Sequence, residues 1–139
     1  MIKKFVNDIY LDITLIIFLA IIAISRWHSG IDQILGMTLC IVSMVFWVRA
    51  RAQLGDSFSV RPKATTLIES GIYAKIRHPI YLFSSLCVLG LVMAIHYFSF
   101  YLLWVVLVML QFLRAKKEEE ILSAKFGQSY EAYKRGTWF

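Results

Sequence analysis

Four long apolar stretches alternate with shorter polar segments along the chain. They cover residues 9–24, 34–48, 80–95 and 97–113. A transmembrane helix needs about 17–25 predominantly apolar residues, so flanking residues must extend each stretch to the membrane surface. The pattern predicts an all-α integral membrane protein with about four transmembrane helices.

The last two apolar stretches are separated by a single residue, His96. Helices that are joined this closely must run antiparallel, so we expect a tight helical hairpin with His96 at its polar tip. After the fourth stretch the sequence becomes charged but keeps a helical spacing of its apolar residues. Gly127 is a natural helix break, which predicts a short cytoplasmic helix on each side of it.

The composition agrees with a membrane protein that forms one domain. Hydrophobic residues make up 59% of the 139 residues, and the mean hydropathy is +0.66. Both values exceed those of ordinary soluble domains. Residues 1–52 are expected to form two N-terminal transmembrane helices that precede a functional region at 53–139. Cys40 and Cys87 lie within apolar stretches, where cysteine behaves as a small hydrophobic residue, so no metal site is expected.

The basic residues are distributed unevenly between the two ends of the apolar stretches. Fourteen of the fifteen lysine and arginine residues precede the first stretch, lie in the segment 49–78 or follow the fourth stretch, and only Arg26 lies on the opposite side. The positive-inside rule therefore places both termini and the segment 49–78 in the cytoplasm. The net charge of +6 reflects this topology and contact with membrane lipids, so no nucleic-acid partner is expected.

A basic segment that contains a proline ends where the third apolar stretch begins. Pro79 suits the first turn of a helix that runs through Ile95, since proline has no N–H and its φ is fixed near the helical value. Arg77 and His78 would then lie at the helix start, where unpaired N–H groups and the helix dipole favour an anion. The alternative interpretation is a basic anchor beside the membrane.

A second polar cluster follows the fourth apolar stretch. Arg114 and Glu118 are four residues apart and share one face of a helix. The hairpin brings this face back to the start of the third apolar helix, where His78 and Tyr81 stand. The alternative for Arg114 and Glu118 is a solvated ion pair, which contributes only about 0.3–0.5 kcal/mol.

These motifs together resemble the isoprenylcysteine carboxyl methyltransferase family, which is itself similar to the membrane phospholipid N-methyltransferases. The resemblance covers roughly residues 45–135. It rests on two motifs in the right order with one helical hairpin between them. The motif residues are Gly71-Ile72-Tyr73, Arg77-His78-Pro79-Ile80-Tyr81, Gly90, Arg114, Glu118-Glu119, Leu122, Phe126-Gly127, Tyr130 and Tyr133.

The resemblance implies a membrane enzyme that uses S-adenosylmethionine to methylate a lipophilic or membrane-embedded acceptor. It makes 53–139 the cofactor-binding catalytic region, with its pocket on the cytoplasmic side, and it gives Arg114 a catalytic, substrate-facing role. A bacterial inner membrane is the expected location. The implied cofactor contacts are Thr66, Leu67, Ile68, Tyr73, Arg77, His78, Pro79, Tyr81 and Glu118.

Several alternatives remain open at the level of sequence. A membrane sterol-type reductase has a broadly similar C-terminal hairpin and would bind a nicotinamide cofactor. A non-catalytic membrane subunit would use small residues such as Gly36 and Gly90 to pack against partner helices. The sequence specifies neither the oligomeric state nor the methylated group, for which a carboxylate, an amine and a hydroxyl all remain open.

Overall fold

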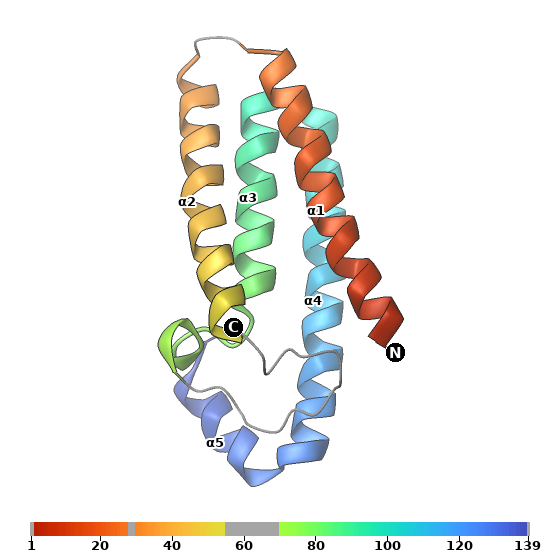
Figure 1. The fold of residues 1–139 in the computed structure, drawn as a ribbon, viewed down its shortest axis with the longest axis vertical. Coiled ribbons are helices and arrows are strands. Elements are labelled where there is room, and N and C mark those ends of the chain that lie inside the picture. The colour runs from red at the N-terminus through yellow and green to blue at the C-terminus, as the bar shows by residue number, and fades with distance from the viewer. Residues whose placement is uncertain (1, 28–29, 55–69, 139) are drawn as a thin grey trace.

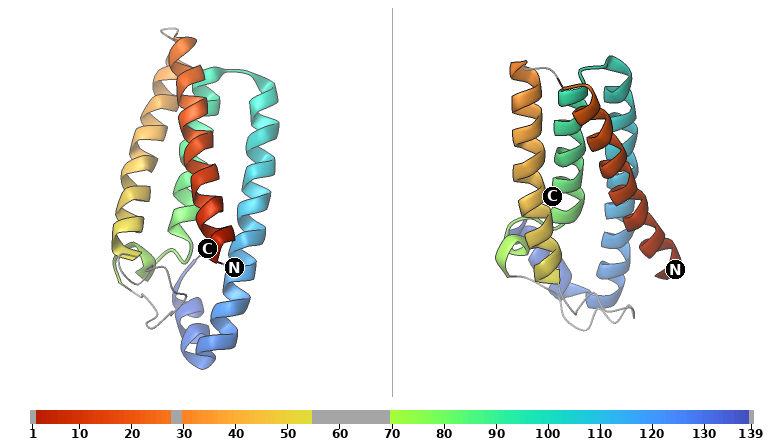
Figure 2. Two further views of the ribbon diagram at one scale, coloured as in Figure 1. Left: turned by 45° about the vertical axis from the view of Figure 1, so that its right-hand side comes forward. Right: turned by 45° about the horizontal axis from the view of Figure 1, so that its top comes forward.

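The computed structural model describes residues 2–27, 30–54 and 70–138, and within these ranges the chain is helical (Figure 1). Four long helices lie side by side, and a short helix and a 3-10 turn cover one end of the bundle (Figures 1 and 2). This arrangement confirms the predicted all-α class. The elements are α1 (Ile2–Ser25), α2 (Ile31–Leu54), η2 (Gly71–Ala74), α3 (Pro79–Ile95), α4 (Phe98–Phe126) and α5 (Gln128–Gly136).

Helix α3 forms the centre of the bundle, and nearly all of its side chains are apolar. Its inward residues include Cys87, Leu91 and Val92, each no more than 2% exposed. Leu19 and Ala23 of α1 are fully buried in the same core cluster. A helix that is hydrophobic all round is stable only when other helices or lipid cover it.

Helices α2 and α3 approach each other closely through small residues. A Cβ atom on Gly36 would lie 2.8 Å from the backbone nitrogen of Ala94, and one on Gly90 would lie 2.7 Å from that of Cys40. Real Cβ atoms do not approach backbone this closely, so glycine at both positions is what permits the contact. The Sγ atoms of Cys40 and Cys87 are 3.3 Å apart in the same interface.

The outer faces of the bundle expose many large apolar side chains. Ile21 on α1, Ile41 on α2 and Met109 on α4 are each more than 60% exposed. Soluble monomers rarely expose large contiguous apolar surfaces, so these faces favour a lipid environment. The regions Ile31–Gln53 and Phe98–Phe126 are long and apolar enough to cross a membrane, whereas those at Ile13–Ser25 and Pro79–Ile95 are shorter. The prediction of four crossings stays a prediction.

The predicted hairpin between the last two apolar stretches is confirmed. His96 adopts a left-handed backbone conformation with φ of 58°, and its N–H donates to the carbonyl of Val92 at 3.1 Å. A left-handed residue with this hydrogen bond is a common helix C-cap. The exposed ring of His96 also pairs with Asp32 at the start of α2, with Nδ1 2.8 Å from Oδ2.

Helix α4 continues well beyond its apolar part. Its 29 residues correspond to a length of about 44 Å, which exceeds the roughly 30 Å hydrocarbon core. The charged turns after Leu113 are part of this one continuous helix and exceed the length needed to cross a bilayer, instead of forming the separate short helix that the sequence predicted. Gly127 ends this helix with φ of 52°, so the predicted break is confirmed, and α5 is the one short helix that follows it.

Candidate functional site

The start of α3 lies at the end of the bundle that η2 and α5 cover. Gln53 near the end of α2 holds η2 in place, because its Oε1 accepts the N–H of Ile72 at 2.9 Å. Pro79 is the first residue of α3 and is fully buried, which confirms the predicted helix start. The backbone carbonyl of His78 accepts the N–H of Leu82 at 3.1 Å, so His78 is the N-terminal cap.

The His78 ring lies between two carboxylates of α4. Its Nε2 is 3.3 Å from Oε1 of Glu119, and its Nδ1 is 3.7 Å from Oε2 of Glu118. The ring is 5% exposed, and its centroid is 5.9 Å from that of Tyr81. The structure thus brings together the two polar clusters that the hairpin was predicted to unite.

Glu119 is the most heavily bonded carboxylate of this cluster, although the sequence singled out Glu118. Its Oε1 accepts from Nε of Arg77 at 3.1 Å, and its Oε2 accepts from Nζ of Lys134 at 2.9 Å. Burial acts to raise the pKa of Glu119, but the hydrogen bonds from Lys134 and His78 and the charge of Arg77 outweigh it, so the pKa is lowered. The carboxylate is therefore ionised at neutral pH.

Arg77 binds the C-terminal part of the described chain. One guanidinium nitrogen, Nη1, donates to the carbonyls of Thr137 at 2.8 Å and Lys134 at 3.1 Å. The N–H of Trp138 donates to the carbonyl of Lys75 at 3.0 Å beside it. These contacts give Arg77 a structural part in docking α5, while its implied contact with a cofactor stays a prediction.

Two tyrosine hydroxyls next to this cluster are buried. Tyr73 on η2 is 7% exposed and Tyr130 on α5 is 1% exposed, and neither hydroxyl has a hydrogen-bond partner among the described residues. Burial, with a smaller effect of the Glu118 charge, raises the pKa of Tyr73. Burial, with the Glu119 charge next, raises the pKa of Tyr130 to about 12. Both hydroxyls are neutral donors at physiological pH.

Arg114 lies half-buried on the inward stripe of α4, one turn before Glu118. Because α4 is helical throughout this segment, the predicted shared face of Arg114 and Glu118 is confirmed. Gln111 and Ala115 on the same stripe are buried. Gln111 connects α4 to α3: its Nε2 donates to Oγ of Ser84 at 2.9 Å, and its Oε1 accepts from Oγ of Ser85. A chain of polar groups thus extends from the His78 cluster into the apolar part of the bundle.

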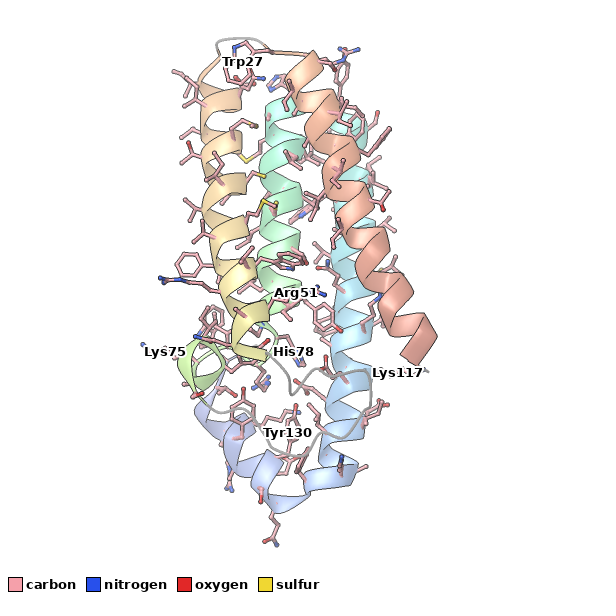
Figure 3. The ribbon with its side chains drawn as sticks, viewed as in Figure 1. Trp27, Arg51, Lys75, His78, Lys117 and Tyr130 are labelled. Atoms are coloured by element: carbon pink, nitrogen blue, oxygen red, sulfur yellow. The ribbon has the colours of Figure 1, made fainter. Side chains whose placement is uncertain are left out.

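A groove of about 640 Å³ separates α4 from α5 next to the cluster. Figure 3 shows Tyr130 between these two helices, below His78. The groove is lined by Lys116, Glu119, Glu120, Ser123, Ala124, Tyr130, Glu131 and Lys134.

Three of the predicted cofactor contacts precede η2 in the sequence. Thr66, Leu67 and Ile68 lie outside the described residues. Sequence reasoning missed Glu119 and Tyr130 as site residues, although both belong to the motifs quoted above. The available signal was helical position, because Glu119 is one residue further around α4 than Glu118 and faces α5.

The family model for phospholipid methyltransferases matches residues 31–129. This range begins with α2 and ends within the first turn of α5, so it contains His78, Arg114, Glu118 and Glu119. No match is found among curated proteins or among solved structures. Since the matched range covers most of the sequence, the chain belongs to the phospholipid methyltransferase family.

Proposed function

We propose that this protein transfers a methyl group from S-adenosylmethionine to a lipid-like or membrane-partitioned acceptor. Membership of a methyltransferase family supports an enzyme of this class. The observation that carries the proposal is the position of His78, at the start of α3 and between the carboxylates of Glu118 and Glu119. It joins a helix start, whose free N–H groups favour an anion, to carboxylate acceptors in one place.

The polar groups of S-adenosylmethionine fit this set of residues. Its carboxylate suits the first N–H groups of α3, at Ile80 and Tyr81, which have no carbonyl partner within the helix. The charge of Glu119 is balanced by Arg77 and Lys134, whereas Glu118 is 42% exposed and can accept from the ammonium group or a ribose hydroxyl.

When bound, the cofactor supplies a methyl group that its sulfonium already activates. The work left to the chain is to align donor and acceptor and to exclude water. We assign alignment of the cofactor to His78 and Glu118. Tyr81, whose ring lies against His78, is placed to offer an aromatic face to a cation, a contact worth about 0.5–2 kcal/mol.

The depth of the site in the membrane supports a methyl acceptor at the level of the lipid headgroups. If the His96 turn lies at the opposite membrane surface, the 17 residues of α3 place His78 about 26 Å from it. The stretch of α4 from Tyr97 to Glu118 spans about 32 Å. Since the hydrocarbon core is roughly 30 Å thick, His78 would lie a few ångströms inside its boundary and Glu118 just beyond it, so the pair would lie close to the lipid headgroups.

We assign recognition of the acceptor to Arg114. It lies on the inward face of α4 between the polar cluster and the Gln111 contacts, so a headgroup at this depth would meet it. A guanidinium binds carboxylate or phosphate with two parallel hydrogen bonds. An anionic headgroup is therefore the proposed class of acceptor. One candidate for the methylated group is a carboxylate, as in isoprenylcysteine carboxyl methylation.

We also infer an integral membrane protein of the bacterial inner membrane, with the site and both termini in the cytoplasm. The ends of the described chain lie in the same half of the bundle as η2 and α5 (Figures 1 and 2). Fourteen of the fifteen basic residues fall on this side in the four-helix topology.

A binding and transfer experiment tests the proposal. Purified protein in lipid nanodiscs would be titrated with S-adenosylmethionine and with a reduced nicotinamide, and then incubated with radiolabelled S-adenosylmethionine and membrane lipids. Saturable binding of S-adenosylmethionine with label in a lipid product is the expected result. Binding of the nicotinamide alone would favour a reductase, and binding of neither would favour a non-catalytic subunit.

A further inference from the structure

Tyr130 carries a buried donor that the described chain leaves unused. It is the largest of the fully buried side chains, yet its hydroxyl has no hydrogen-bond partner among the described residues. Folded proteins pair nearly all buried polar side-chain atoms, so an orphaned hydroxyl calls for an explanation. A ligand that accepts a hydrogen bond is one such explanation.

The charges around Tyr130 are those of the candidate site. Glu119, Arg77 and Glu118 all act on its hydroxyl electrostatically. Tyr73 on η2 also has a buried hydroxyl without a hydrogen-bond partner in the described ranges, and it too is influenced by Glu118. Two elements that are distant in sequence therefore present unused donors beside the same carboxylates.

The hydroxyl of a neighbouring tyrosine on the same helix is satisfied within the protein. Tyr133 donates to the backbone carbonyl of Tyr73 at 2.7 Å, and its ring centroid is 6.1 Å from that of Tyr130. Helix α5 therefore gives the hydroxyl of Tyr133 a hydrogen-bond partner, whereas the hydroxyl of Tyr130 has none among the described residues. Tyr130 also lines the groove between α4 and α5 together with Glu119 and Lys134. Its hydroxyl is buried, so a ligand in the groove would reach it through a local shift of α5.

We propose that Tyr130 is a cofactor-binding residue whose hydroxyl donates a hydrogen bond to S-adenosylmethionine. The inference rests on the proposed function and extends the cofactor site from α3 and α4 to α5. The hydroxyl stays protonated at physiological pH, so it suits an acceptor such as the cofactor carboxylate, a ribose oxygen or an adenine nitrogen. Docking of α5 by Arg77 then becomes part of assembling the site.

The test compares Tyr130→Phe with Tyr133→Phe, which remove the same atom from two positions three residues apart. The melting temperature without cofactor and the dissociation constant for S-adenosylmethionine would be measured for both variants and for the wild type. Tyr130→Phe should leave the melting temperature unchanged or raise it, because no protein hydrogen bond is lost. It should raise the dissociation constant about three- to tenfold. Tyr133→Phe should lower the melting temperature, because the carbonyl of Tyr73 loses its donor.

Two results would overturn the inference about Tyr130 alone. The first is an unchanged affinity for S-adenosylmethionine in Tyr130→Phe, while the wild type binds it. The second is a loss of stability or of folded protein in Tyr130→Phe that equals the loss in Tyr133→Phe, because the hydroxyl would then have a partner within the protein. Failure of the wild type to bind S-adenosylmethionine would instead overturn the proposed function, and the inference with it.

Discussion

Glu118 and Glu119 are adjacent in sequence, but their contacts differ enough for mutation to separate their roles. Glu118→Gln keeps the side-chain volume and removes one charge from a partly exposed carboxylate. We expect it to weaken binding of S-adenosylmethionine by about 10- to 150-fold, since a charged hydrogen bond is worth roughly 1.5–3 kcal/mol, while the fold stays intact. Isothermal titration calorimetry measures this change. Unchanged affinity for S-adenosylmethionine would mean that Glu118 is a solvated helix residue and does not contact the cofactor.

Glu119→Gln is the matched control, because it breaks contacts within the protein. Loss of the Arg77 and Lys134 contacts should lower the stability by about 1–3 kcal/mol at neutral pH. The lowered pKa means that the contribution of Glu119 is present above about pH 4.5 and is lost as the pH falls through the pKa of the folded state. Melting temperatures should therefore differ between wild type and variant at pH 7 and converge towards acidic pH.

Arg114 and His78 should separate acceptor recognition from cofactor binding. Arg114→Ala should spare cofactor affinity but reduce turnover, whereas His78→Ala should weaken cofactor binding itself. Arg114→Lys should recover only part of the loss, because lysine lacks the planar fork of arginine. Cofactor affinity and single-turnover methylation, measured on equal amounts of folded protein, test this division. Equal binding defects in both alanine variants, or full activity in Arg114→Lys, would contradict it.

The convergence of His78 with Glu118 could be predicted because hairpin geometry and a four-residue spacing are both readable from sequence. The central place of Glu119 in the hydrogen bonds of this cluster could not be predicted. Three glutamates follow one another at 118–120, and the rotation of α4 decides which of them faces α5. That rotation is set by packing of the buried residues Gln111 and Ala115, which lie on a stripe that hydropathy alone does not identify.

At the level of helices, the sequence predicted the bounds of α3 to the residue, since Pro79 fixes its start and His96 its end. The other long helices extend past the apolar stretches that predicted them. Helix α2 continues beyond Val48 to Leu54, and α4 continues beyond Leu113 to Phe126. Hydropathy marks only the part of a helix that suits lipid, whereas arginine, lysine and glutamate have high helix propensity and let the backbone hydrogen bonds continue into water.

The close contact between α2 and α3 predicts a specific sensitivity to small substitutions. Gly90→Ala would place a methyl group against the backbone of α2 and should lower stability by about 1–3 kcal/mol, because backbone cannot yield as a flexible side chain does. Gly136→Ala on α5 is the control, since a Cβ there meets nothing within 4 Å. Thermal unfolding of both variants in detergent tests the contact. If Gly90→Ala were as stable as Gly136→Ala, α2 and α3 would have to move apart at little cost in free energy.

For the molecule as a whole, the four-helix topology makes a prediction about sidedness. Reporter fusions after Arg26 and after Phe139 should lie on opposite sides of the membrane, with the second in the cytoplasm, because the basic residues gather at that end. A fusion between α4 and α5, at Gly127, should agree with the one after Phe139. An external signal from Phe139 would contradict the model, since a cytoplasmic cofactor could not reach the site.

The two-residue turn at His96 and Tyr97 ties α3 and α4 to a common starting level, so the distance from this turn to the His78 cluster does not change with the membrane. Lipid acyl chains do change in length with growth conditions, and a mismatch of a few ångströms must be absorbed by helix tilt or by local deformation of the bilayer. We expect methyl transfer in vesicles to be fastest at one acyl-chain length and to fall in thicker bilayers, where the cluster would sink below the headgroups. Rates that do not vary across a series of chain lengths would contradict a fixed depth. An enzyme built in this way would adjust its rate of lipid modification to the thickness of the membrane that holds its substrate.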